Sequence, residues 1–164
     1  MFWNYCNNME NNKKPSRRNE RSQAFQVLYG LAFSPAATRE DLAGAFAAAP
    51  EQEDDRMQSG RQGGFAWELV EGVWEKGADL DALLGRFSQN WRVERMGKVE
   101  ATILRLALFE LLFRPDVPPK VAINEAIELS KQFGGHDSRS FINGILDAAA
   151  KALDNGEIHR IRGL

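Results

Sequence analysis

The segment from about Met96 to Phe113 is apolar around its whole circumference. Its Leu, Ile, Val and Ala residues are not confined to one face of a helix. From Ile103 onward only Arg105 and Glu110 interrupt the apolar run. A helix that is hydrophobic on every side is stable in water only when other elements surround it. The run is too short to span a bilayer. The sequence therefore predicts a buried central helix that other elements must cover.

The residues available to cover it favour further helices. The chain contains 20 Ala and 16 Leu but only seven Val and seven Ile, and β-branched residues lose more conformational freedom in a helix than Ala or Leu. No stretch alternates apolar and polar residues for long, so we predict no strands. Apolar spacing, capping residues, Gly and Pro predict helices over about 16–33, 39–49, 65–76, 80–87, 96–113, 118–133 and 139–153.

Seven helices with short connections predict an all-α bundle in one domain, over residues 16–154. We expect residues 1–15 to be a disordered N-terminal extension and residues 155–164 to be a flexible C-terminal tail. Residues 51–64 are acidic and then glycine-rich, which indicates a loop.

Single residues predict how some of these helices begin and pack. Thr38, with Asp41 three residues on, is a candidate N-cap for the second helix, and Asp79 is one for the fourth. Gly144 lies inside the last helix, where Gly costs about 1 kcal/mol relative to Ala. We interpret Gly144 as a point of close helix crossing and Asn143 as a hydrogen-bond partner of a neighbouring turn.

Several classes of protein are excluded. Cys6 is the only cysteine, so an internal disulfide framework or a cysteine zinc cluster cannot form. The N-terminal stretch lacks the apolar core of a signal peptide. We expect a cytoplasmic protein with no membrane partner.

The sequence also offers little for catalysis. No phosphate-binding loop, dinucleotide turn, HExxH or GxSxG motif is present. The two histidines, His136 and His159, lie beside a Gly-Gly turn and in the tail. We predict no enzyme activity, no catalytic residues, no metal and no cofactor.

Charge is unevenly distributed, although the formal net charge is only −2. Residues 11–21 carry five basic side chains against Glu20 alone, a net of +4, whereas residues 39–60 carry a net of −4. Arginines on a flexible arm can contact phosphates and stack on bases. Tyr29 lies near the side of the helix that carries Arg21. A solubilising arm with a half-buried tyrosine explains the same pattern, and sequence physics leaves both interpretations open.

Three segments resemble the NusB family of bacterial transcription antitermination factors. They are VEATILRLALFEL (99–111), DVPPKVAINEAIELSKQFGG (116–135) and DSRSFINGILD (137–147), and RRNERSQAFQVLYGLAF (17–33) agrees with the family's arginine-rich first helix. The resemblance covers roughly residues 17–153. It implies a NusB-type bundle of seven helices made of two small helical subdomains.

The resemblance also implies a function. NusB proteins bind the boxA element of nascent ribosomal RNA transcripts as a heterodimer with the ribosomal protein NusE, and promote assembly of an antitermination complex on RNA polymerase. The family's RNA-contacting positions fall on Arg17, Arg18, Arg21, Tyr29, Asp137, Ser138, Arg139 and Phe141, and the acidic positions facing NusE fall on Glu94 and Glu100. By helix spacing alone, Phe141 is equally well a core residue.

Two alternatives remain open at this stage. The same helical module forms the N-terminal part of certain ribosomal RNA cytosine methyltransferases. The chain could also be a protein–protein scaffold, including a homodimer, whose basic arm only aids solubility.

Overall fold

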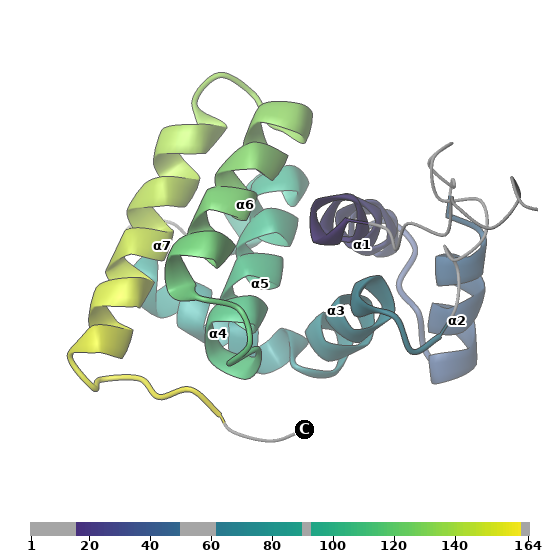
Figure 1. Ribbon diagram of the computed structural model, residues 1–164. Coiled ribbons are helices and arrows are strands. Elements are labelled where there is room, and N and C mark those ends of the chain that lie inside the picture. The colour runs from purple at the N-terminus through teal and green to yellow at the C-terminus, as the bar shows by residue number, and fades with distance from the viewer. Residues whose placement is uncertain (1–15, 50–61, 90–92, 162–164) are drawn as a thin grey trace, which may run out of the picture.

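The computed structural model describes residues 16–49, 62–89 and 93–161, and seven α-helices lie in these ranges with no strand (Figure 1). The expected disordered extension 1–15, with Lys13 and Lys14, and most of the expected loop 51–64 lie outside them. The predicted all-α fold is confirmed. The helices are α1 (Arg17–Leu31), α2 (Arg39–Ala47), α3 (Phe65–Glu75), α4 (Gly77–Phe87), α5 (Lys98–Phe113), α6 (Pro119–Phe133) and α7 (Ser138–Asp154), and a short 3₁₀ turn covers Val93–Arg95.

The helices form two groups, as expected from the family resemblance. In Figure 1, α6 and α7 stand side by side with α5 behind α6, while α1, α2 and α3 make up the other half. α5 packs on α4, α6 and α7 in its own group and also on α1 and α3. It therefore joins the two groups.

α5 is the buried centre that its composition predicts. Twelve of its residues are buried, and they lie on every side of the helix: Ala101, Thr102, Ile103, Leu104, Leu106, Ala107, Leu108, Phe109, Glu110, Leu111, Leu112 and Phe113. Arg105 is half-buried, and its guanidinium donates to both oxygens of Asp81 on α4, with Nε 2.6 Å from Oδ1. The one buried carboxylate of α5, Glu110, is paired with an arginine described below.

Of the two N-caps predicted from the sequence, the one at α2 is present and the one at α4 is not. Thr38 caps α2 as predicted: its hydroxyl accepts from the Asp41 N–H, and the Asp41 carboxylate accepts from the Thr38 N–H at 2.9 Å. These hydrogen bonds lower the pKa of Asp41. The prediction that Asp79 caps α4 was wrong. Lys76 is both the C-cap of α3 and the N-cap of α4. Because α4 begins at Gly77, Asp79 lies in its first turn.

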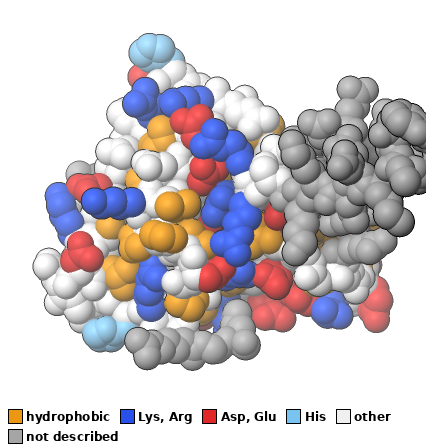
Figure 2. All heavy atoms as spheres, viewed as in Figure 1, with side chains coloured by type: hydrophobic (Ala, Val, Ile, Leu, Met, Phe, Trp, Pro, Cys, Tyr) orange, Lys and Arg blue, Asp and Glu red, His pale blue; other side chains and the backbone are white. Residues whose placement is uncertain are grey.

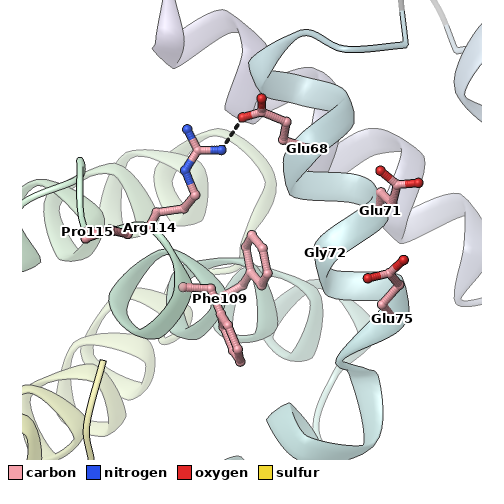
Figure 3. Close-up of a pocket in the computed structure, with 8 residues that line it drawn as sticks. Glu68, Glu71, Gly72, Glu75, Phe109, Arg114 and Pro115 are labelled. Carbon is pink, nitrogen blue, oxygen red and sulfur yellow. Dashed lines mark hydrogen bonds and ion pairs between the residues drawn. The ribbon is translucent and has the colours of Figure 1, made fainter. Parts of the chain in front are cut away.

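The close helix contact lies at Gly72 rather than at Gly144. A Cβ atom on Gly72 of α3 would lie 2.0 Å from Cζ of Phe109 on α5, and the Phe109 ring faces this point of α3 in Figure 3. A Cβ on Gly144 would meet nothing within 4 Å, and Asn143 is exposed. The interpretation of Gly144 as a helix crossing was therefore wrong. Gly72 holds the two helix groups close together.

Residues 155–161 make more contacts than the exposed tail expected from the sequence. Ile158 is buried, and its N–H donates to the carbonyl of Ala152 at 3.2 Å. The N–H of Ile161 donates to the carbonyl of Leu112 at 2.9 Å, and Arg160 donates to that of Val117. The segment after α7 therefore packs along the C-terminal end of α5.

We predict opposite effects for alanine at the two helical glycines. Gly72→Ala forces atoms into the Phe109 ring and should lower the free energy of unfolding by about 1–3 kcal/mol. Gly144→Ala adds a methyl group in open space on an exposed helix face and should raise it by up to about 1 kcal/mol. Urea denaturation of both variants followed by circular dichroism tests this. Equal effects at the two positions would contradict the packing described here.

Candidate nucleic-acid interface

The three arginines at the start of α1 do not share one environment. The side chains of Arg17 and Arg18 are 52% and 63% exposed, whereas Arg21 is only 4% exposed. Ser16 is the N-cap of α1, and its hydroxyl accepts the N–H of Asn19, so all three arginines lie in the first two turns of the helix. The expected basic arm is thus divided into two surface side chains and one internal side chain.

Arg21 is held by Glu110 at the centre of the fold. Its Nε lies 2.9 Å from Oε1 of Glu110 and its Nη2 lies 2.7 Å from Oε2, and Glu110 is 1% exposed. Burial raises the pKa of the Glu110 carboxyl, and the hydrogen bonds from Arg21 oppose that rise. A phosphate could reach Arg21 only by displacing Glu110. In this structure Arg21 fixes α1 on α5.

Arg17 and Arg18 are exposed but oriented by carboxylates. Arg17 pairs with Asp116 at 3.0 Å. Arg18 donates through Nε and Nη2 to Glu125 of α6, at 3.2 and 2.8 Å. The pKa of Asp116 falls to about 2, chiefly because Arg114 hydrogen-bonds to it, with Arg17 contributing its charge. These partners lie about a hundred residues away along the chain, so the arginine-rich segment alone does not predict them.

Two aromatic rings lie at the other end of α1. Tyr29 is half-buried and its ring packs edge-on against that of Phe33, with the centroids 5.1 Å apart. Phe33 is 61% exposed. Lys98 donates to the carbonyl of Ala32 at 2.7 Å, and its Nζ lies 4.6 Å from the centre of the Phe33 ring. Phe33 is not among the residues predicted from the sequence, although its position four residues after Tyr29 is a signal that could have identified it.

The residues predicted around the start of α7 separate into surface and internal positions. Asp137 and Arg139 are exposed, whereas Ser138 is buried and Phe141 is half-buried against the core. The Ser138 hydroxyl accepts the N–H of Gly135 at 2.9 Å and donates to Glu100 of α5.

The two acidic positions predicted to face a protein partner also differ. Glu94 is exposed in the 3₁₀ turn Val93–Arg95. Glu100 is half-buried in the first turn of α5, where it accepts the hydrogen bond from Ser138. The predicted partner surface and the predicted RNA-contacting turn therefore meet at one hydrogen bond.

One face of the molecule gathers many of these charges. Figure 2 shows Lys and Arg side chains in a band in front of the boundary between α1 and α6, with Asp and Glu side chains between them. A shallow hollow of about 240 Å³ lies there, and Lys131 pairs with Glu128 at 2.7 Å beside it. The lining residues are Arg18, Glu125, Glu128, Leu129, Lys131 and Gln132. The two cations of this lining are therefore balanced by its two carboxylates.

A second hollow, of about 500 Å³, lies between α3 and the end of α5. Glu68 and Arg114 point toward one another across it, and Glu71 points away from Arg114 (Figure 3). Glu71 pairs instead with Arg39 of α2. These carboxylates are engaged in ion pairs between helices, which is a structural arrangement.

The part of the chain that the structure describes contains neither a candidate metal site nor a candidate membrane-spanning helix. No three residues among its His, Cys, Asp and Glu lie where they could hold a metal ion. None of its helices is both long enough and apolar enough to cross a bilayer.

Comparison with known sequences matches this chain to one protein family. The model of the NusB family matches residues 18–151. A protein of Oleidesulfovibrio alaskensis called transcription antitermination protein NusB is 62% identical over 143 residues, covering 87% of this chain and 92% of that protein. A protein of the same name from Nitratidesulfovibrio vulgaris is 59% identical over 144 residues, covering 88% of this chain and 94% of that protein.

Solved structures share the fold. NusB of T. maritima superposes with a TM-score of 0.70 at 30% identity, covering 92% of this chain and 96% of that one. A crystal structure of the antitermination factors NusB and NusE in complex with dsRNA contains a chain that superposes with a TM-score of 0.65. That chain is 23% identical, and the match covers 84% of this chain and 97% of that one.

The buried ion pair predicts an asymmetry between single and double substitutions. Arg21→Met leaves the Glu110 carboxylate buried without a cation and should lower the free energy of unfolding by about 3–5 kcal/mol. Changing both residues together, Arg21→Met with Glu110→Leu, should recover most of this loss, because neither charge is then buried. Chemical denaturation followed by circular dichroism measures both.

Lys151→Ala is the matched control, because it breaks an exposed ion pair with Asp147. It should change stability by less than about 1 kcal/mol. A cost for Arg21→Met as small as that of the control would show that the pair does not hold α1 on α5.

Proposed function

This chain belongs to the NusB family of transcription antitermination proteins, and on that premise we propose that it binds boxA RNA of nascent ribosomal RNA transcripts as a heterodimer with NusE. In that complex it promotes assembly of the antitermination machinery on RNA polymerase. The observation that carries the proposal is the presence, in a NusB fold, of exposed arginines at the start of α1 and of an exposed aromatic ring just beyond its C-terminal end. A complex of NusB, NusE and dsRNA with this fold supports it.

In this proposal the exposed arginines bind the phosphates of the RNA. Arg17 and Arg18 project from the first turn of α1, and Arg139 projects from the first turn of α7. Guanidinium groups bind phosphate with two parallel hydrogen bonds, as Arg18 already binds the Glu125 carboxylate. Arg21 serves this surface indirectly, because it fixes the helix that carries the other two.

In this proposal the aromatic rings at the C-terminal end of α1 bind the bases of the RNA. Single-stranded RNA is read mainly by stacking unpaired bases on aromatic rings and arginine planes. Tyr29 and Phe33 offer two adjoining rings, of which Phe33 is the more exposed. Phe141 is half-buried against the core and therefore offers a smaller surface to a base.

The surface for NusE falls on Glu94 and Glu100. Glu94 is exposed and Glu100 is half-buried. A ribosomal protein is rich in cations, and opposite charges steer association and fix its orientation. The names of the relatives favour antitermination over the methyltransferase module, and a homodimer of this chain is an outcome that the binding experiments below would reveal.

We predict a moderate salt dependence for RNA binding. If Arg17, Arg18 and Arg139 each contact one phosphate, the logarithm of the association constant should fall against the logarithm of salt concentration with a slope of about −2. Fluorescence anisotropy of a labelled single-stranded boxA RNA measures this slope. Arg18→Ala should weaken binding and reduce the slope by about 0.7.

Arg86→Ala is the control for this series. Arg86 is exposed and paired with Glu157, on α4 rather than α1, so its loss should leave RNA binding unchanged. A slope near zero, or equal losses for Arg18→Ala and Arg86→Ala, would contradict the proposed phosphate contacts.

The carboxylate beside Arg18 yields a second prediction. Glu125 competes with phosphate for the exposed Arg18 guanidinium, so Glu125→Gln should tighten RNA binding by a few-fold. The same anisotropy titration measures the change. Asp147→Asn removes a carboxylate whose partner, Lys151, is on the exposed side of α7, and it should leave RNA affinity unchanged. Weaker RNA binding by Glu125→Gln would show that Glu125 supports the site instead of competing for it.

A further inference from the structure

The first turns of α5 and α7 are joined by a hydrogen bond between two side chains. The Ser138 hydroxyl donates to Oε1 of Glu100, and it accepts the N–H of Gly135 at 2.9 Å. Ser138 is buried. Asp137, which precedes it at the N-cap of α7, makes no side-chain cap hydrogen bond. The conformation of the α6–α7 turn, residues 134–137, therefore depends on Ser138, and Ser138 depends on Glu100.

Two glycines lie next to this pair of side chains. A Cβ on Gly97 would lie 2.2 Å from Oε2 of Glu100, and a Cβ on Gly134 would lie 2.8 Å from Cβ of Ser138. Any larger residue at these two positions would push the carboxylate or the serine away. Glycine at both positions thus leaves the space in which the carboxylate and the serine meet.

The pair lies between the two surfaces that the proposed function assigns. Asp137 and Arg139 flank Ser138 and are exposed on the side of the turn assigned to RNA. Glu100 is half-buried on the side assigned to NusE. One oxygen of Glu100 is taken by Ser138 and the other lies beside Gly97, so a cation that docks on this carboxylate also restrains the serine.

We propose that Glu100 is a positioning residue for the α6–α7 turn, and that its hydrogen bond to Ser138 couples partner binding to RNA binding. This inference rests on the proposed function. Docking of NusE on Glu100 holds the carboxylate in its serine-bound arrangement and orders the turn, so that RNA binding costs less conformational entropy. Because such coupling is reciprocal, RNA raises the affinity for NusE by the same factor.

The test measures the ratio of the RNA dissociation constants without and with saturating NusE, using labelled single-stranded boxA RNA and the full chain. For the unchanged protein we expect a ratio of at least about five. Ser138→Ala removes the hydroxyl and should bring the ratio to about one. Ser140→Ala is the matched control: its hydroxyl, two residues along the same helix, donates only to the Asp137 carbonyl in this structure, so the ratio should not change.

A conservative variant separates positioning from direct contact. Glu100→Gln keeps an oxygen that can accept the Ser138 hydroxyl but loses the charge that attracts a cation. It should bind NusE more weakly and keep most of the enhancement ratio, whereas Glu100→Ala should lose both. If Glu100 acted only by direct contact with NusE, both variants would weaken NusE binding and both would leave the ratio unchanged.

A second measurement needs no variant. Hydrogen exchange of the Gly135 amide, which donates to Ser138, should slow when NusE binds to the unchanged protein in the absence of RNA. The inference is overturned if Ser138→Ala keeps the full ratio, or if the Gly135 amide exchanges at the same rate with and without NusE. If the unchanged protein binds neither boxA RNA nor NusE, the proposed function itself fails. Binding of both with a ratio of one overturns only the coupling.

Discussion

The ion pair between Arg21 and Glu110 is the interaction on which the arrangement of the two helix groups depends. It joins α1 of one group to the buried helix α5 of the other, and neither side chain is exposed by more than 4%. A buried ion pair adds little net stability compared with apolar residues, but a charge left without its partner is costly. Only the docking of α1 that places Arg21 against Glu110 is therefore favourable. That docking sets the direction in which Arg17 and Arg18 project.

Much of the fold could be predicted from the sequence because it depends on local patterns. The apolar circumference of residues 96–113 predicts a buried helix, and the Thr38 and Asp41 pair predicts a capped helix start, since both act over a few residues. The roles of Gly72 and Gly144 could not be separated in this way. Both lie inside helices, and only the position of Phe109, on a different helix, decides which glycine is at a close contact.

The candidate site shows the same limit more sharply. A run of arginines reveals the sign of the charge but not the face of the helix on which each side chain lies. Arg18 and Arg21 are three residues apart, yet the first is on the surface and the second is inside, because Glu110 and Glu125 are placed by other helices. Phe33 was overlooked for a related reason. Its exposure follows from the end of α1 at Leu31, which leaves the ring beyond the packed part of the helix.

The ion pairs at the surface change how the net charge of −2 should be understood. Asp116 and Glu125 reduce the positive field of α1, and they also hold the guanidinium groups of Arg17 and Arg18 in place. In the proposed complex, RNA binding at this surface replaces one anion by another, so the gain in free energy is smaller than for unpaired arginines, while less side-chain entropy is lost. A modest affinity for RNA alone follows from this exchange. A partner that orders the remaining contacts, such as those around Ser138, then has a large relative effect.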